Sequence, residues 1–108
     1  MAKRGLKVIA RVWRGRTRRQ DADVYNGHYS GEVLPELRRL PGFRGARLLR
    51  RETAEVTEFM SVVFFDDIDA VRRFAGEDYE ATVIAPAARR VLVSFDDRVQ
   101  HFDVTARG

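Results

Sequence analysis

Two histidines are the only side chains in this sequence that ordinarily exchange a proton near neutral pH. His28 and His101 are the only histidines among 108 residues, and the chain has no cysteine. An imidazole that faces a dry pocket can take a proton from a phenol, and the resulting phenolate can react directly with oxygen. His28 and His101 are therefore candidate catalytic residues. The alternative for each is a surface histidine or a hydrogen-bonded structural one.

Aromatic side chains and one arginine could build an apolar slot beside such a base. The candidate ligand-binding residues are Trp13, Tyr25, Tyr29, Phe65, Phe74 and Arg11. The rings would contact a flat aromatic ligand, and the Arg11 guanidinium could meet an oxyanion on it. The alternatives are a place in the hydrophobic core for the rings, Tyr29 and Phe74 above all, and an ordinary ion pair for Arg11.

The sequence contains none of the common metal-binding or nucleophile motifs. The sequence contains no HExxH motif, no EF-hand loop and no GxSxG motif. Without cysteine, disulfides and thiolate nucleophiles are excluded. Asp66 and Asp67 are better explained as part of a helix N-terminus than as an acid/base pair, because adjacent carboxylates point in different directions. We expect no metal site and no cofactor.

The stretch 59–65, FMSVVFF, is apolar on both faces of a predicted strand. Phe59, Ser61, Val63 and Phe65 share one face, and Met60, Val62 and Phe64 share the other. A strand exposed to solvent on one face would alternate apolar and polar residues, so we expect both faces of this strand to be covered by other parts of the protein. Helices of so short a chain can cover only one face. We therefore predict a homodimer in which a second copy covers the other.

The remaining pattern predicts an α+β fold of the ferredoxin-like βαββαβ type. Strands are predicted over 6–14, 45–51, 59–65 and 98–105, and helices over 18–40 and 67–75, with a kink or break at Pro35. A short extra helix could begin at Pro86, although 91–95 reads equally well as a strand. The expected result is a four-stranded antiparallel sheet with two main helices on one face. Residues 1–108 should form a single domain, with 1–5 disordered.

The net charge of +4 conceals an uneven distribution of charge. Residues 1–51 contain 14 Lys/Arg and 4 Asp/Glu, whereas residues 52–108 contain 6 and 12. A scattered basic segment more often forms a solvated rim than a nucleic-acid surface, and 58–65 lacks the glycine of an RNA-recognition strand. No apolar stretch suggests a membrane span or a signal peptide. We expect a cytoplasmic protein without nucleic-acid or membrane partners.

Three short motifs resemble the antibiotic biosynthesis monooxygenase family. They are the turn Leu-Pro-Gly-Phe at 40–43, the sequence Phe-Asp-Asp-Ile-Asp-Ala at 65–70, and His-Phe-Asp-Val at 101–104. The resemblance covers about residues 7–105. It implies a dimeric α/β barrel in which two sheets face one another, with a pocket between each sheet and its helices. The family includes cofactor-independent oxygenases of polycyclic aromatic phenols and haem-degrading enzymes.

The sequence departs from the family pattern at two places that bear on the expected activity and cofactor. Many catalytic members carry a tryptophan at the position of Phe65, and phenylalanine lacks the indole N–H. The haem-degrading members use a histidine on the second helix as iron ligand, and 67–76 contains none, so haem is not expected. The resemblance implies a cofactor-free monooxygenase acting on a phenolic or polyketide-like substrate. The alternative is a non-catalytic ligand-binding or assembly domain of the same fold.

Overall fold

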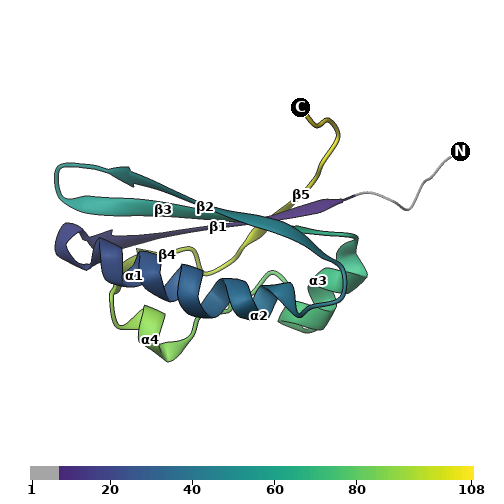
Figure 1. Ribbon diagram of the computed structural model, residues 1–108, viewed down its shortest axis with the longest axis horizontal. Coiled ribbons are helices and arrows are strands. Elements are labelled where there is room, and N and C mark those ends of the chain that lie inside the picture. The colour runs from purple at the N-terminus through teal and green to yellow at the C-terminus, as the bar shows by residue number, and fades with distance from the viewer. Residues whose placement is uncertain (1–7) are drawn as a thin grey trace, which may run out of the picture.

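The computed structural model describes residues 8–108 and has the predicted order of elements (Figure 1). Its strands are β1 (Ile9–Arg18), β2 (Phe43–Glu52), β3 (Val56–Phe65), β4 (Leu92–Phe95) and β5 (Gln100–Asp103). Its helices are α1 (Ala22–His28), α2 (Leu34–Arg38), α3 (Ile68–Ala75) and α4 (Pro86–Arg89). The expected disorder of 1–5 and the predicted start of the first strand lie outside the described residues.

The five strands form one antiparallel sheet in the order β2-β3-β1-β4, and β5 also pairs with β1. All ten residues of β1 pair with β3, from Ile9 opposite Phe65 to Arg18 opposite Val56. Along its other edge, β1 pairs first with β5 and then with β4. The ferredoxin-like prediction is thus confirmed. The segment that read equally well as helix or strand adds β4, a fifth short strand beyond the four predicted.

All four helices lie on one side of the sheet (Figure 1). Alternate residues of β3 point toward them, and Phe59, Val63 and Phe65 are buried there. The intervening residues Met60 and Val62 are only half-buried on the opposite side, which no described helix covers. Strand alternation therefore assigns the two faces as the sequence predicts.

The long first helix is continuous through Pro35, where we predicted a kink or break. A 3-10 turn (Arg19–Asp21) precedes α1, and a π-helical turn (Tyr29–Val33) joins α1 to α2. Pro35 lies at the start of α2, directly after the π-helical turn, and it cannot donate a hydrogen bond to a carbonyl of that turn. The π-helical turn accommodates the pyrrolidine ring of Pro35 without ending the helix, so the helix does not break there.

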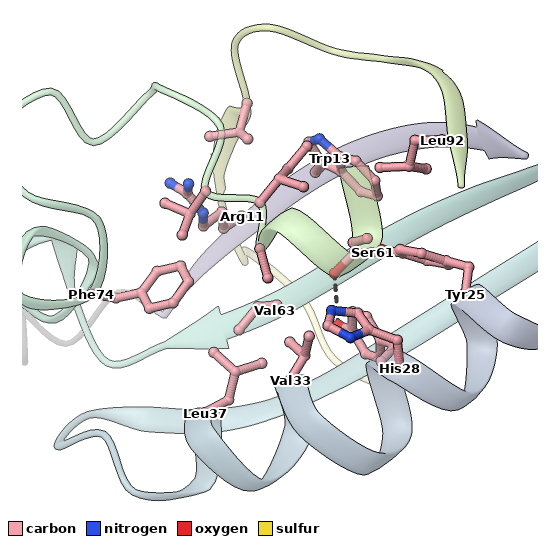
Figure 2. Close-up of a pocket in the computed structure, with 16 residues that line it drawn as sticks. Arg11, Trp13, Tyr25, His28, Val33, Leu37, Ser61, Val63, Phe74 and Leu92 are labelled. Carbon is pink, nitrogen blue, oxygen red and sulfur yellow. Dashed lines mark hydrogen bonds between the residues drawn. The ribbon is translucent and has the colours of Figure 1, made fainter. Parts of the chain in front are cut away.

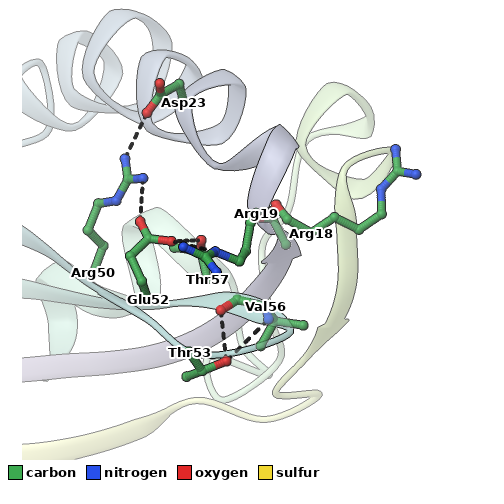
Figure 3. Close-up of polar contacts among 9 residues, drawn as sticks. Arg18, Arg19, Asp23, Arg50, Glu52, Thr53, Val56 and Thr57 are labelled. Carbon is green, nitrogen blue, oxygen red and sulfur yellow. Dashed lines mark hydrogen bonds and ion pairs between the residues drawn. The ribbon is translucent and has the colours of Figure 1, made fainter.

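Polar contacts tie the start of α1 to the β2–β3 hairpin (Figure 3). The Arg50 guanidinium contacts Asp23 at 3.0 Å and Glu52 at 2.8 Å, and the Thr57 hydroxyl donates to Glu52 at 2.7 Å. The Thr57 hydrogen bond, followed by Arg50, lowers the pKa of Glu52. Exposed ion pairs contribute little to stability, so the main effect of this network is to fix where α1 begins on the sheet.

Candidate active site

A cavity lies between the helix-facing side of the sheet and the helices (Figure 2). Six of the residues selected from the sequence line it, namely Arg11, Trp13, Tyr25, His28, Tyr29 and Phe74. The structure therefore brings most of the predicted set into one place.

The sheet forms the floor of the cavity through alternate residues of two paired strands. Arg11 and Trp13 come from β1, and they lie opposite Val63 and Ser61 of β3. Side chains two apart in a strand share a face, so these four form one patch. Trp13 lies along its strand over Gly15, where a Cβ would collide with the indole ring. Gly15 thus leaves the space that the Trp13 ring occupies.

The first helix forms the facing wall. Tyr25, His28 and Tyr29 recur at intervals of three and four residues and so lie on one side of the helix. The Tyr25 ring centroid lies 6.1 Å from that of Trp13 and 6.3 Å from that of His28. Tyr25 is buried in the hydrophobic cluster that also contains Trp13, Tyr29 and Phe59.

Two polar atoms of the residues that line the cavity have no hydrogen-bond partner among the described residues. They are Trp13 Nε1 and His28 Nδ1, and both are buried. His28 Nδ1 lies 3.5 Å from Glu32 Oε1, close enough for an ion pair only when the imidazole is protonated. Buried polar atoms are normally satisfied, so atoms that lack a partner beside a cavity are places where a ligand can bind. The Tyr29 hydroxyl, by contrast, is hydrogen-bonded to Ser61 Oγ at 2.7 Å.

Arg11 and His101 meet at the other end of the cavity, beside Phe74. Arg11 Nη1 contacts His101 Nε2 at 3.1 Å, and the guanidinium lies 5.4 Å from the Phe74 ring centroid. Burial lowers the pKa of Arg11 to about 10, so the side chain is still a cation at neutral pH. Burial and then the Arg11 charge lower the pKa of His101, which favours a neutral imidazole that accepts from Arg11. His101 does not itself line the cavity.

Phe65 is the one aromatic candidate that lies outside the cavity. Its side chain is 0% exposed and stacks against Phe74 with 5.9 Å between ring centroids. The residue therefore supports Phe74 from behind, and its predicted contact with a ligand finds no support in this placement.

Several lining residues were not predicted from the sequence. Ser61, Val33 and Leu37 line the cavity, as does the irregular segment 83–85. Ser61 was predicted only as part of a strand face, and helical spacing alone does not distinguish Val33 and Leu37 from ordinary core residues. The segment 83–85 lies in a connector that has no apolar periodicity, so nothing in the sequence connected it with the site.

Metal and membrane sites are not seen in the part of the chain that the structure describes. No group of three or more His, Cys, Asp or Glu side chains is placed to hold an ion there. None of the described helices combines the length and apolar character needed to cross a bilayer.

The two buried tyrosines make the fold sensitive to alkali. Burial, together with the neighbouring Tyr29, raises the pKa of Tyr25, and burial raises the pKa of Tyr29. An unfolded tyrosine titrates near pH 10, so the stability linked to these groups is present below about pH 10 and falls as the pH rises further. Tyr79 is the only other tyrosine of the chain, so in a Tyr79→Phe variant the phenolate absorbance reports Tyr25 and Tyr29 alone. As the pH of this variant is raised, we expect the phenolate absorbance to appear together with loss of the circular dichroism signal. Phenolate absorbance from a folded protein would contradict this.

Solved structures share this fold, whereas no protein-family model and no curated protein sequence matches the chain. A protein from Bacillus cereus assigned to the antibiotic biosynthesis monooxygenases is 12% identical, with a TM-score of 0.66 over 94% of this chain and 97% of the other. The cofactor-independent oxygenase SnoaB from Streptomyces nogalater is 23% identical, with a TM-score of 0.62 over 94% and 95%. A Streptomyces coelicolor monooxygenase, ActVA-Orf6, solved with nanaomycin D, is 16% identical, with a TM-score of 0.54 over 96% and 90%. The fold is thus that of the antibiotic biosynthesis monooxygenases, as the sequence motifs predicted.

Proposed function

We propose that the cavity binds a flat aromatic molecule and that the protein is a cofactor-independent monooxygenase of phenolic or polyketide-like substrates. The observation that carries this proposal is the imidazole of His28, which lines a cavity rich in aromatic rings. The names of the structural neighbours support the same chemistry, since SnoaB is described as a cofactor-independent oxygenase. The ligand nanaomycin D in ActVA-Orf6 supports a small-molecule site.

In this proposal the substrate supplies the electrons and the protein supplies a base. His28 takes the phenolic proton, and the electron-rich phenolate reacts with oxygen at the activated ring carbon. For an anthrone, the CH₂ carbon loses two hydrogens and becomes a C=O that contains one oxygen atom, and the second oxygen atom leaves as water. A dry apolar cavity suits this step because it excludes water from the reactive anion.

A fused-ring substrate requires part of the cavity wall to move. The cavity measures about 90 Å³, below the roughly 300 Å³ at which ordinary small-molecule sites begin. The segment 83–85 forms part of the wall, belongs to no helix or strand, and leaves Val83 exposed at 53%. We infer that this segment moves outward when the ligand enters.

Oxygen consumption with dithranol, a dihydroxyanthrone, tests the proposal. We expect uptake above the buffer rate, with one water formed for each oxygen consumed and an anthraquinone as product. A rate equal to that of buffer would contradict the catalytic proposal. Calorimetric binding without turnover would favour the alternative, a non-catalytic ligand-binding domain of the same fold.

We also propose that the protein is a homodimer formed through the uncovered face of the sheet. Its apolar residues include Val12 on β1 and Met60, Val62 and Phe64 on β3, and the arginines Arg14 and Arg47 lie among them, opposite Met60 and Val62. Leu49 on β2 and Phe102 on β5 extend it and are 49% and 52% exposed. A large apolar surface of this kind usually marks an interface, and a second copy of the same face is complementary to it.

Placing a charge on this face tests the dimer. We expect Phe64→Glu to convert a dimer into a monomer at micromolar concentration in sedimentation velocity, because the carboxylate would be buried opposite Ala10 and Gly45, neither of which can pair with it. Val24→Glu is the matched control, since Val24 is 59% exposed on α1, on the opposite side of the molecule. A wild-type protein that sediments as a monomer would contradict the proposal.

A further inference from the structure

We propose that the ligand of this cavity carries a carboxylate, and that Arg11 binds this carboxylate at the Phe74 end. The inference rests on the proposed function, because it concerns the ligand of the same site. It defines the substrate as an aromatic acid and gives it one orientation in the cavity.

Arg11 is the only buried charged side chain among the described residues, and it is 5% exposed. No carboxylate of the described chain forms an ion pair with it. Burial sets Arg11 apart from the other described arginines, none of which is buried. Eight of those pair with Asp or Glu at the surface, namely Arg14, Arg18, Arg19, Arg44, Arg50, Arg51, Arg72 and Arg98. Arginine is rarely buried without a counter-ion, since taking its charge out of water is costly.

The groups around Arg11 orient it and leave its charge uncompensated. The guanidinium donates to the carbonyl oxygen of Tyr79, to that of Ala81 at 3.1 Å, and to His101 Nε2 at 3.1 Å. These partners are neutral, and the Phe74 ring adds only a cation–π contact. Three acceptors use three of the five N–H groups of an arginine, so two remain, one on Nε and one on Nη2. Two N–H donors are what a carboxylate accepts in a bidentate pair.

The cavity has its polar groups at two ends, which fixes how such a ligand would lie. Arg11 and Phe74 lie at one end, and His28 and Tyr25 lie at the other (Figure 2). A ligand whose carboxylate meets Arg11 therefore directs the opposite edge of its ring system toward His28. The acid would bind and orient the substrate, while the proton that leaves in the reaction would be at the far end.

A pair of ring-matched probes tests the inference in the wild-type protein. Anthraquinone-2-carboxylate and anthraquinone-2-carboxamide share their rings and differ in charge. Trp13 is the only tryptophan and lines the cavity, so quenching of its fluorescence reports binding. We expect the carboxylate to bind about tenfold more tightly, because hydrogen bonds between charged partners are roughly twice as strong as neutral ones. Equal affinities would overturn the anion site and leave the aromatic pocket standing, whereas no binding of either probe would overturn both.

Two variants then assign the preference to Arg11. Arg11→Gln should lower the affinity for the carboxylate to that for the carboxamide. Arg14→Gln removes the same charge from an exposed position on the same strand and should leave the ratio unchanged. A preference that survives in Arg11→Gln would overturn the assignment. If Arg11→Gln does not fold, Arg11→Lys serves instead, and it should reduce the ratio because an ammonium group cannot form the bidentate pair.

Discussion

Replacing His28 with alanine is expected to lower the rate of oxygen uptake with dithranol by about 10²- to 10⁴-fold, the usual contribution of a positioned general base. His28 lines the cavity, and its side chain is only 10% exposed, so bulk water cannot easily take over the proton. The measurement is the initial rate of oxygen consumption, compared with the buffer rate. Trp13 fluorescence quenching by anthraquinone-2-carboxylate should be nearly unchanged, because the carboxylate binds at the other end.

His101→Ala is the matched comparison, since it removes the only other imidazole of the chain. His101 lies behind Arg11 and does not line the cavity. Dithranol has no carboxylate, so its oxidation should be much less affected by this variant than by His28→Ala. A larger loss for His101→Ala than for His28→Ala would contradict the assignment of His28 as the base.

The fold was predictable because its main elements have strong local patterns. The alternation of Phe59, Ser61, Val63 and Phe65 with a second apolar set requires a strand with two distinct faces, and the structure has these faces. Asp67 was predicted to cap the second main helix, and its Oδ1 accepts from the Ala70 N–H at 2.9 Å. Short elements were less determined, because the four residues of β4, three of them apolar, are compatible with helix or strand until pairing with β1 selects strand.

The site was predictable where it depends on periodicity. Residues two apart on a strand and three or four apart on a helix share a face, and this brings Arg11, Trp13, Tyr25 and Tyr29 together. The contacts of Arg11 with Tyr79 and Ala81 could not be predicted, because they depend on how an irregular connector crosses the sheet edge. Loop positions of this kind are fixed by long-range packing and leave no periodic signal in the sequence.

Phe65 was predicted to contact a ligand because it is aromatic, but the structure places it in the hydrophobic core. Its truncation should therefore have a large effect on stability. Phe65→Ala is expected to lower the free energy of unfolding by about 3–5 kcal/mol, because it removes a fully buried ring and leaves a cavity. The ring is 0% exposed and belongs to the core cluster that contains Leu37 and Val71. The measurement is urea denaturation followed by circular dichroism.

Phe74→Ala provides the contrast that separates core from ligand contact. Phe74 lines the cavity and is only half-buried, so its truncation should cost less stability than that of Phe65 and more affinity for anthraquinone-2-carboxylate. Phe65→Leu refills much of the lost volume, and we expect it to recover most of the stability with binding close to that of the wild type. If Phe65→Leu folds normally but loses ligand affinity as severely as Phe74→Ala, Phe65 contacts the ligand after all. In that case Phe74 would also have to move when the ligand binds, in addition to the segment 83–85.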